Sequence, residues 1–231
     1  MPRTSISVSR ADDTIAVMAT NPRDAEPLVF PVGHYMGPFY PGKDAPLKHH
    51  IVRVGWDTPK LPDDDHLGVW ALAHGLSTRI DTTPWTRRAV EDAAREAGMA
   101  DPARIYDTLL ERGVIVEVHD ALEFAQRYRM QSLMVGLGNT PDDPLHSGIG
   151  LPGVTPAVMV PLKTYQLWQW GHLGNSLWQA CQLLAEVGRE ASPDSPQESD
   201  PEYVLQRAIG ALRTLIAHNV AYLDTARTPA A

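Results

Sequence analysis

Two short stretches of the chain follow one sequence pattern. V-W-A-L-A-H-G runs from Val69 to Gly75, and L-W-Q-W-G-H-L runs from Leu167 to Leu173. Both fit the pattern [VL]-W-x-[LW]-[AG]-H, and in a helix a Trp and a His four residues later lie on the same face. The two stretches therefore indicate a duplicated unit, a pair of histidine sites, or two unrelated apolar helices.

Four further signals recur around these stretches in the same order, which favours duplication. Each copy has an apolar strand before the pattern, a tryptophan in a second helix, an Asp-Pro pair opening a third helix, and a β-branched or aromatic strand after it. An Asp-Pro pair is a helix cap followed by proline at the first helical position. In the order of the chain these signals are His50–Val54, Trp85, Asp101-Pro102 and Val114–Val118 in the first copy, and Ala157–Val160, Trp178, Asp200-Pro201 and Val220–Leu223 in the second.

The order strand, three helices, strand resembles that of tandem winged helix–turn–helix proteins, over residues 48–118 and 155–224. The resemblance implies a mainly α fold with small β-sheets (α+β), in which Pro102–Arg112 is the recognition helix and Val114–Val118 begins the wing. The class includes DNA-binding regulators, and also acidic members that dimerise and clasp a partner protein. The predicted division is an N-terminal arm and turn-rich segment (1–47), a first unit (48–135), a Gly/Pro-rich linker or loop (136–154) and a second unit (155–231).

The composition is that of an ordinary globular protein, with 43% apolar and 21% charged residues. The single cysteine, Cys181, excludes an internal disulfide framework and a multi-cysteine zinc site, and it is predicted to be a core residue. No apolar run approaches the length of a membrane span, and Met1–Arg10 lacks an apolar signal core. A cytoplasmic protein is expected, and the preference for Arg over Lys is one associated with high-GC bacterial genomes.

The formal net charge of −8 repels polyanions, so DNA binding requires a local patch of basic residues. Arg104, Thr108 and Arg112 form an i, i+4, i+8 stripe on the predicted recognition helix. Asp107 and Glu111 flank that stripe, and the alternative is a solvated helix face that pairs with itself. The candidate DNA-contacting residues are Arg87, Arg88, Arg104, Thr108, Arg112, Gln206, Arg207 and Arg213.

Three functions remain open on these residues. The first is a DNA-binding transcriptional regulator with tandem winged-helix units, and the second is a non-enzymatic interaction module that binds a protein partner or forms a homodimer. The third is an enzyme that uses the Gly/Pro-rich loop and His34, His50 or His146. No catalytic residue is predicted, since the sequence has no recognisable arrangement of nucleophile and base.

No cofactor or metal site is predicted either. His74 and His172 are expected to be structural, each hydrogen-bonded to backbone and packed against the tryptophan of its helix. His49 and His50 point to opposite faces of a strand, so they cannot share a metal ion. The fragment Gly136-Leu137-Gly138 lacks the third glycine, the lysine and the following helix of a phosphate-binding loop.

Overall fold

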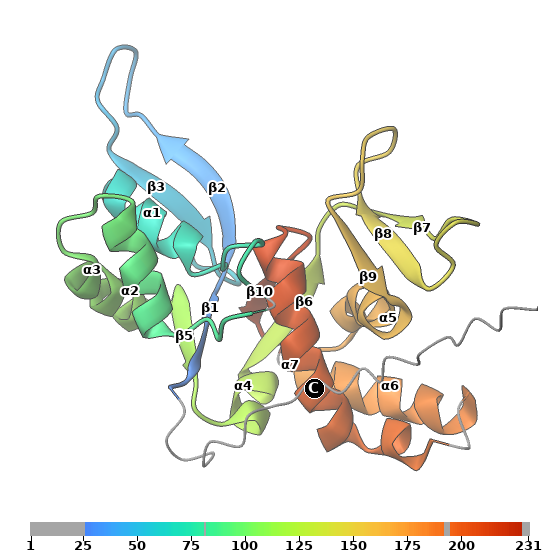
Figure 1. Ribbon diagram of the computed structural model, residues 1–231. Coiled ribbons are helices and arrows are strands. Elements are labelled where there is room, and N and C mark those ends of the chain that lie inside the picture. Colours follow the sequence, from blue (N-terminus) through green and yellow to red (C-terminus); the bar gives the residue numbers. More distant parts are fainter. Residues whose placement is uncertain (1–25, 81, 192–194, 228–231) are drawn as a thin grey trace, which may run out of the picture.

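The computed structural model describes residues 26–80, 82–191 and 195–227 of the chain (Figure 1). In this part the protein is a mixed α+β fold with small antiparallel sheets, as the sequence predicted at that level. Its elements fall into two sets that follow the same order. Residues 1–25, which form most of the predicted N-terminal arm, lie outside the described residues.

The first set of elements starts with β1 (Leu28–Pro31) and an antiparallel sheet of β2 (His34–Phe39), β3 (His49–Arg53) and β4 (Lys60–Leu61). Three helices follow, α1 (Asp64–Leu72), α2 (Arg87–Glu96) and α3 (Pro102–Glu111). The last strand, β5 (Ile115–Val118), returns to β1 and pairs with it antiparallel, with Leu28 opposite Val118. The first and last strands therefore close the unit.

The second set repeats this plan after the connecting helix α4 (Ala121–Arg127). It has a first strand, β6 (Tyr128–Ser132), and an antiparallel sheet of β7 (Val135–Gly138), β8 (His146–Gly150) and β9 (Val158–Pro161). The helices are α5 (Leu162–Trp170), α6 (Leu177–Ala191) and α7 (Pro201–Ala217), with short 3-10 turns η1 (Gly171–Leu173) and η2 (Pro196–Ser199). The last strand, β10 (Ala221–Thr225), pairs antiparallel with β6.

Backbone irregularities also recur at equivalent positions of the two sets. The turn into the three-stranded sheet holds a residue with positive φ in each, Gly33 at +98° and Met134 at +64°. The next strand then carries a bulge in each, between Tyr35 and Gly37 in β2 and between Gly136 and Gly138 in β7. A bulge bends a strand and increases its twist, so each sheet turns away from the first strand at the same place.

The third helix of each set ends in the same way. Gly113 and Asn219 both have positive φ, which reverses the chain at the end of the helix. The next residue then donates back into the helix, Val114 to the Leu109 carbonyl at 3.1 Å and Val220 to the Leu215 carbonyl at 3.0 Å. These shared details indicate that the second set is a structural copy of the first.

Several local predictions are confirmed. Asp101 caps α3 by accepting from the Arg104 amide, and Asp200 caps α7 by accepting from the Glu202 amide. The predicted strands near residues 50, 157 and 221 are β3, β9 and β10.

Three local predictions are wrong. Residues 136–154 are not a linker, because they include β8 and most of β7; their glycines adopt the positive φ and close packing that a bulged sheet requires. Val114–Val118 does not begin a wing, since β5 pairs with β1 far back in the sequence. Trp85 lies before α2 rather than inside it, and its carbonyl accepts from the Val29 amide at 2.9 Å.

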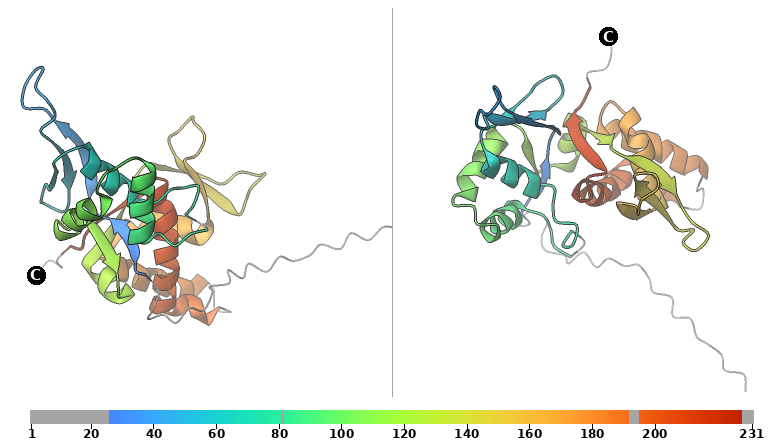
Figure 2. Two further views of the ribbon diagram at one scale, coloured as in Figure 1. Left: turned by 60° about the vertical axis from the view of Figure 1, so that its left-hand side comes forward. Right: turned by 90° about the horizontal axis from the view of Figure 1, so that it is seen from above.

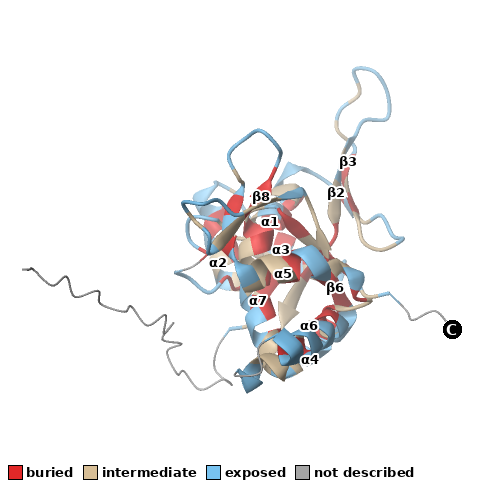
Figure 3. Cartoon of the chain, turned by 90° about the vertical axis from the view of Figure 1, so that its right-hand side faces the viewer, coloured by how far each residue is buried: buried red, intermediate tan, exposed pale blue. Residues whose placement is uncertain are grey.

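The cores of the two units are in direct contact, and in the described residues no linker separates them. Successive residues of β1 point to opposite sides, so Val29 packs in the core of the first unit and Phe30 in the core of the second. Ala217, at the end of α7, packs in the first core. Buried residues gather in the middle of the molecule, and the loops that project from it are exposed (Figure 3).

Candidate interaction surfaces

The arginines predicted on α2 are engaged by carboxylates of the same chain. Arg87 lies 2.7 Å from Glu91 Oε1 and 2.7 Å from Asp107 Oδ1, and its guanidinium stacks over the Tyr106 ring at 4.8 Å. The hydrogen bonds that Arg87 donates to Asp107 and Glu91 raise its pKa above the usual value. Arg88 is more exposed and lies 3.9 Å from Glu26.

The predicted stripe on α3 is present, but internal contacts occupy it. Arg104 Nε lies 3.0 Å from Asp101 Oδ2, and the Thr108 hydroxyl donates to the Arg104 carbonyl at 3.0 Å. Arg112 donates to the backbone carbonyl of Lys60 at the edge of β4. Each predicted contact residue of α3 therefore has a partner within its own unit.

The candidates on α7 point to different places. Arg207 NH1 lies 2.6 Å from Glu198 Oε1, and Gln206 is exposed. Arg213 turns toward the first unit, where it donates to the Ile80 and Thr83 carbonyls at 2.7 and 2.8 Å. Arg213 is a link between the two units rather than part of an open basic face.

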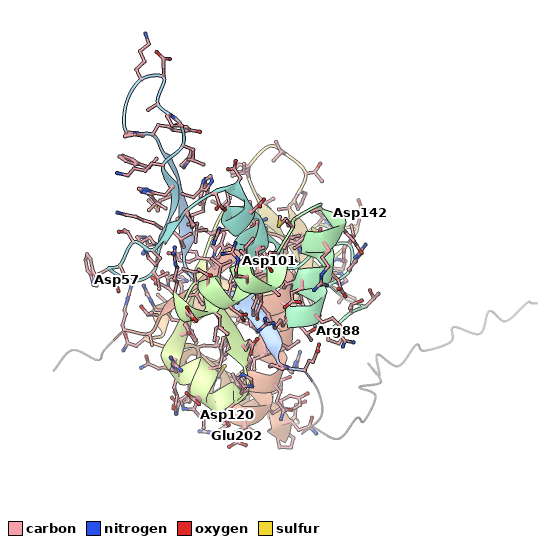
Figure 4. All side chains as sticks on the ribbon, turned by 90° about the vertical axis from the view of Figure 1, so that its left-hand side faces the viewer. Asp57, Arg88, Asp101, Asp120, Asp142 and Glu202 are labelled. Carbon is pink, nitrogen blue, oxygen red and sulfur yellow. The ribbon has the colours of Figure 1, made fainter. Side chains whose placement is uncertain are left out.

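Charge of both signs alternates along this side of the molecule. A surface hollow on α2 is lined by three arginines and three carboxylates, Glu26, Arg87, Arg88, Glu91, Asp92 and Arg95. Acidic side chains are spread over the whole molecule, among them Asp57, Asp101, Asp120, Asp142 and Glu202, and Arg88 is labelled with them (Figure 4). The predicted DNA contacts thus lie among carboxylates rather than in a continuous positive surface.

Many of the exposed apolar side chains lie on the two three-stranded sheets and their loops, while others lie on α4, α5, η1 and α6. These sheets project from the body and splay apart from one another (Figures 1 and 2). In the first unit they are Met36, Phe39 and Tyr40 of the β2–β3 hairpin and Trp56 of the β3–β4 turn; in the second they are Val135, Leu145, Leu151, Val154 and Met159. Exposed apolar side chains gathered on projecting elements are typical of a protein-binding surface.

The equivalent hairpins of the two units carry opposite charge. The β2–β3 hairpin has Lys43 and Lys48 around a single acidic residue, Asp44. The connection between β7 and β8 has Asp142 and Asp143 and no lysine or arginine. The hydrogen bond from His146 holds the pKa of Asp143 below its usual value, so this carboxylate is ionised at neutral pH.

A buried ion cluster joins the β6–β10 sheet to the β2–β3–β4 sheet where the two units meet. Asp224 of β10 is 1% exposed and lies 3.2 Å from Arg129 NH2 and 3.6 Å from Arg53 NH1. It also accepts from the Gly55 amide at 2.6 Å, which anchors the tight turn that presents Trp56 to solvent. Sequence reasoning missed Asp224, although a carboxylate after the apolar residues Ala221–Leu223 was a signal that it is paired.

His74 has the structural role predicted for it. Its Nδ1 lies 3.1 Å from the Trp70 carbonyl, and its ring meets the Trp70 ring edge-on at 4.6 Å. Trp70 and Trp168 are both buried, as expected of core anchors. His172 differs from the prediction: among the described residues its buried Nδ1 has no hydrogen-bond partner.

Burial lowers the pKa of His74 to about 4, and this predicts a loss of stability in acid. The unfolded chain takes up the proton near the ordinary histidine pKa, so the stabilising difference is present above that value and falls as the pH drops toward 4. Between pH 7 and pH 5 we expect His74 to account for about 2 kcal/mol of lost unfolding free energy. Urea unfolding at both pH values measures it, and His74→Gln should lose less stability over this range than wild type. His119→Gln, at an exposed histidine, should lose as much stability as wild type. The assignment is contradicted if His74→Gln also loses as much as wild type.

The three histidines considered for an enzyme site take part in separate contacts. His34 packs against the Tyr222 ring at 4.9 Å, and His146 pairs with Asp143. His50 Nε2 lies 2.9 Å from Asp64 Oδ1 and its Nδ1 lies 2.9 Å from the Tyr35 hydroxyl. Because an ionised carboxylate only accepts, Nε2 donates to Asp64 and Nδ1 accepts from Tyr35. These two hydrogen bonds link β2, β3 and α1.

The remaining features to consider are the single cysteine, groups of metal-binding side chains and helices long enough to cross a membrane. Burial raises the pKa of Cys181 to about 12, so this thiol is an unreactive core residue, as predicted. Within the described residues, histidine, cysteine, aspartate and glutamate side chains form no group of three or more that is placed to hold a metal ion. In the same part of the chain no helix combines the length and the apolar character needed to cross a membrane.

A scan against models of known protein families, and searches of curated proteins and of solved structures, find no match to this chain.

Proposed function

We propose that this chain is a non-enzymatic protein–protein interaction module, and that a second copy of the chain binds through the β2–β3 and β7–β8 hairpins. The observation that carries the proposal is the opposite charge of these two equivalent hairpins, each of which also has exposed apolar residues. Lys43 and Lys48 lie with Tyr40 on one hairpin, and Asp142 and Asp143 lie with Leu145 on the other.

In this dimer the apolar side chains supply the buried area of each contact, and the charges determine which hairpin meets which. The lysine hairpin of one copy meets the aspartate hairpin of the other, and a reciprocal exchange closes a dimer with two identical contacts. Like hairpins repel one another, which sets the orientation of the two copies. The acidic balance of the whole chain does not oppose this arrangement, because each contact is local.

The resemblance to winged-helix proteins does not decide between partners, because that class includes both kinds. Each unit has three helices with a capped third helix, but a three-stranded sheet precedes the helices and, in the described residues, no wing follows them. A DNA-binding regulator is the alternative function for such a fold. The internal pairing of Arg87, Arg104 and Arg207 favours the protein partner, since these side chains would have to leave carboxylates to meet phosphates.

Light scattering after size exclusion tests the dimer. We expect wild type to dimerise, and Lys43→Glu/Lys48→Glu to weaken the dimer about tenfold or more, because each contact becomes repulsive. Asp142→Lys/Asp143→Lys should weaken it similarly. An equimolar mixture of the two variants should form heterodimers, since both contacts again join opposite charges.

Arg88→Glu/Arg104→Glu is the matched control, because it changes the net charge equally at residues outside both hairpins. This control should dimerise like wild type. A protein that stays monomeric, or a dimer that the hairpin variants leave unchanged, contradicts the proposal. A DNA mobility shift at low salt that weakens with salt and with Arg104→Ala or Arg207→Ala would replace it with the regulator.

A further inference from the structure

A cavity opens between the three helices of the second unit, away from the hairpins. It lies between the start of α5, the second half of α6 and the first half of α7, the helices that pack together in this unit (Figure 1). Its volume is about 90 Å³, and it is partly open to solvent. This volume is below that of a drug-sized site, so a ligand here has to be narrow.

Small residues leave this space unfilled. Ala208 and Ala211 of α7 and Gly188 of α6 line it, where larger side chains would close the gap between the helices. Gly188 also permits close approach, because a Cβ there would lie 2.3 Å from the Glu198 carbonyl oxygen. Leu167, Leu184 and Val204 complete an apolar wall.

The charged residues of the lining form one cluster with an excess of positive charge. Glu198 accepts from Lys163 Nζ at 3.2 Å and from Arg207 NH1 at 2.6 Å. The Glu198 side chain is 18% exposed, whereas those of Lys163 and Arg207 are 40% and 45% exposed. One carboxylate therefore faces two cations, and both cations keep N–H donors for a further acceptor.

We propose that this cavity binds an amphiphile with an unbranched apolar chain and one negatively charged headgroup, such as a fatty acid carboxylate. The apolar chain lies along Leu167, Leu184 and Val204, and the headgroup accepts from Lys163 and Arg207 beside Glu198. A neutral headgroup leaves the second cation uncompensated, and a cationic headgroup adds a third positive charge to the cluster. The proposal is independent of dimer formation, because no residue of the cavity belongs to a hairpin.

Calorimetric titration with three probes of equal chain length tests the headgroup rule: decanoate, decanol and decyltrimethylammonium, each below the concentration at which it forms micelles. We expect saturable binding of decanoate, with decyltrimethylammonium at least tenfold weaker and decanol between them. In Lys163→Gln/Arg207→Gln, decanoate should weaken about tenfold while decanol is unchanged. Arg104→Gln, which removes an exposed arginine paired with one carboxylate elsewhere, should bind decanoate like wild type.

Filling the cavity tests its position. Ala211→Leu places a larger side chain in the lining and should abolish decanoate binding without lowering the melting temperature. Gln206→Leu makes a change of similar character on α7 outside the lining and should leave binding intact. The proposal is overturned if decanoate does not bind, if the cationic probe binds equally well, or if Ala211→Leu binds decanoate like wild type.

Discussion

Replacing Asp224 with alanine is expected to destabilise the protein by about 3–5 kcal/mol, because it leaves a buried guanidinium without its counter-ion. Asp224 is the buried anion between Arg129 and Arg53, and removal of the carboxylate also takes away the acceptor of the Gly55 amide. Arg129 is itself nearly enclosed, and its NH1 has no hydrogen-bond partner among the described residues, so the substitution leaves a poorly solvated cation. In a chain of this size such a loss lowers the melting temperature by about 10 °C.

Urea unfolding of Asp224→Ala against wild type measures the effect, with Glu111→Ala as the control for removing an exposed carboxylate outside both hairpins. The control should change the unfolding free energy by less than about 0.5 kcal/mol. Asp224→Asn keeps one acceptor oxygen, which can serve the Gly55 amide, but it turns an N–H donor toward Arg129 and lacks the charge, so it should fall between wild type and Asp224→Ala. A loss below about 1 kcal/mol in Asp224→Ala would show that the ion cluster does not hold the two units together.

The second large effect is expected at Trp168, the tryptophan of the second repeated pattern. Its indole is buried in the core of the second unit, and its Nε1 donates to the Val220 carbonyl at 2.8 Å. Trp168→Ala opens a cavity at this position and should cost about 3–5 kcal/mol. Thermal and urea unfolding measure the loss.

Trp168→Phe separates the ring from its hydrogen bond. It keeps much of the packing but leaves the Val220 carbonyl without this donor, so about 1–2 kcal/mol is expected. Trp70→Ala, at the equivalent position of the first unit, should cost a similar amount to Trp168→Ala, because Trp70 is also buried and bonds the Val32 carbonyl at 3.3 Å. If Trp168→Ala were as mild as an exposed substitution, the tryptophan would not be a core anchor.

The sequence predicted the helices and the repeat well because local chemistry determines them. Asp-Pro caps such as Asp101-Pro102 satisfy the first amides of a helix wherever they occur, and both copies of the cap were visible. The apolar faces around Trp70 and Trp168 repeat at helical spacing, which a single sequence shows directly. These signals need no knowledge of distant contacts.

The sheets were harder to predict because their pairing is not local. The Gly/Pro-rich segments around Gly37 and Gly138 indicate turns, yet in the structure their glycines form equivalent bulges inside strands. One segment was therefore assigned to an N-terminal region and the other to a linker, although they are copies of one sheet. The pairing of β1 with β5 depends on residues almost ninety positions apart, from Leu28 to Val118.

The charged residues show the same limit. Sequence spacing placed Arg104, Thr108 and Arg112 on one helix face, which is correct, but it did not show that Arg112 reaches the Lys60 carbonyl across the unit. It also gave no indication that Glu198 gathers Lys163 and Arg207, which are far apart in the sequence. Ion pairs within a helix turn can be anticipated, whereas those between elements follow from packing.

The pairing of the first strand with the last has a consequence for the way the chain folds. During synthesis α1, α2 and α3 leave the ribosome before β5 does. Until β5 follows, β1 has no strand to pair with. Only when Ile115–Val118 leaves the ribosome can the first unit close, so its folding should be slow compared with a helical bundle of the same length. Until then both Val29 and Phe30, on opposite sides of β1, are exposed to solvent. Phe30 stays exposed for longer, because it is buried only when the core of the second unit forms.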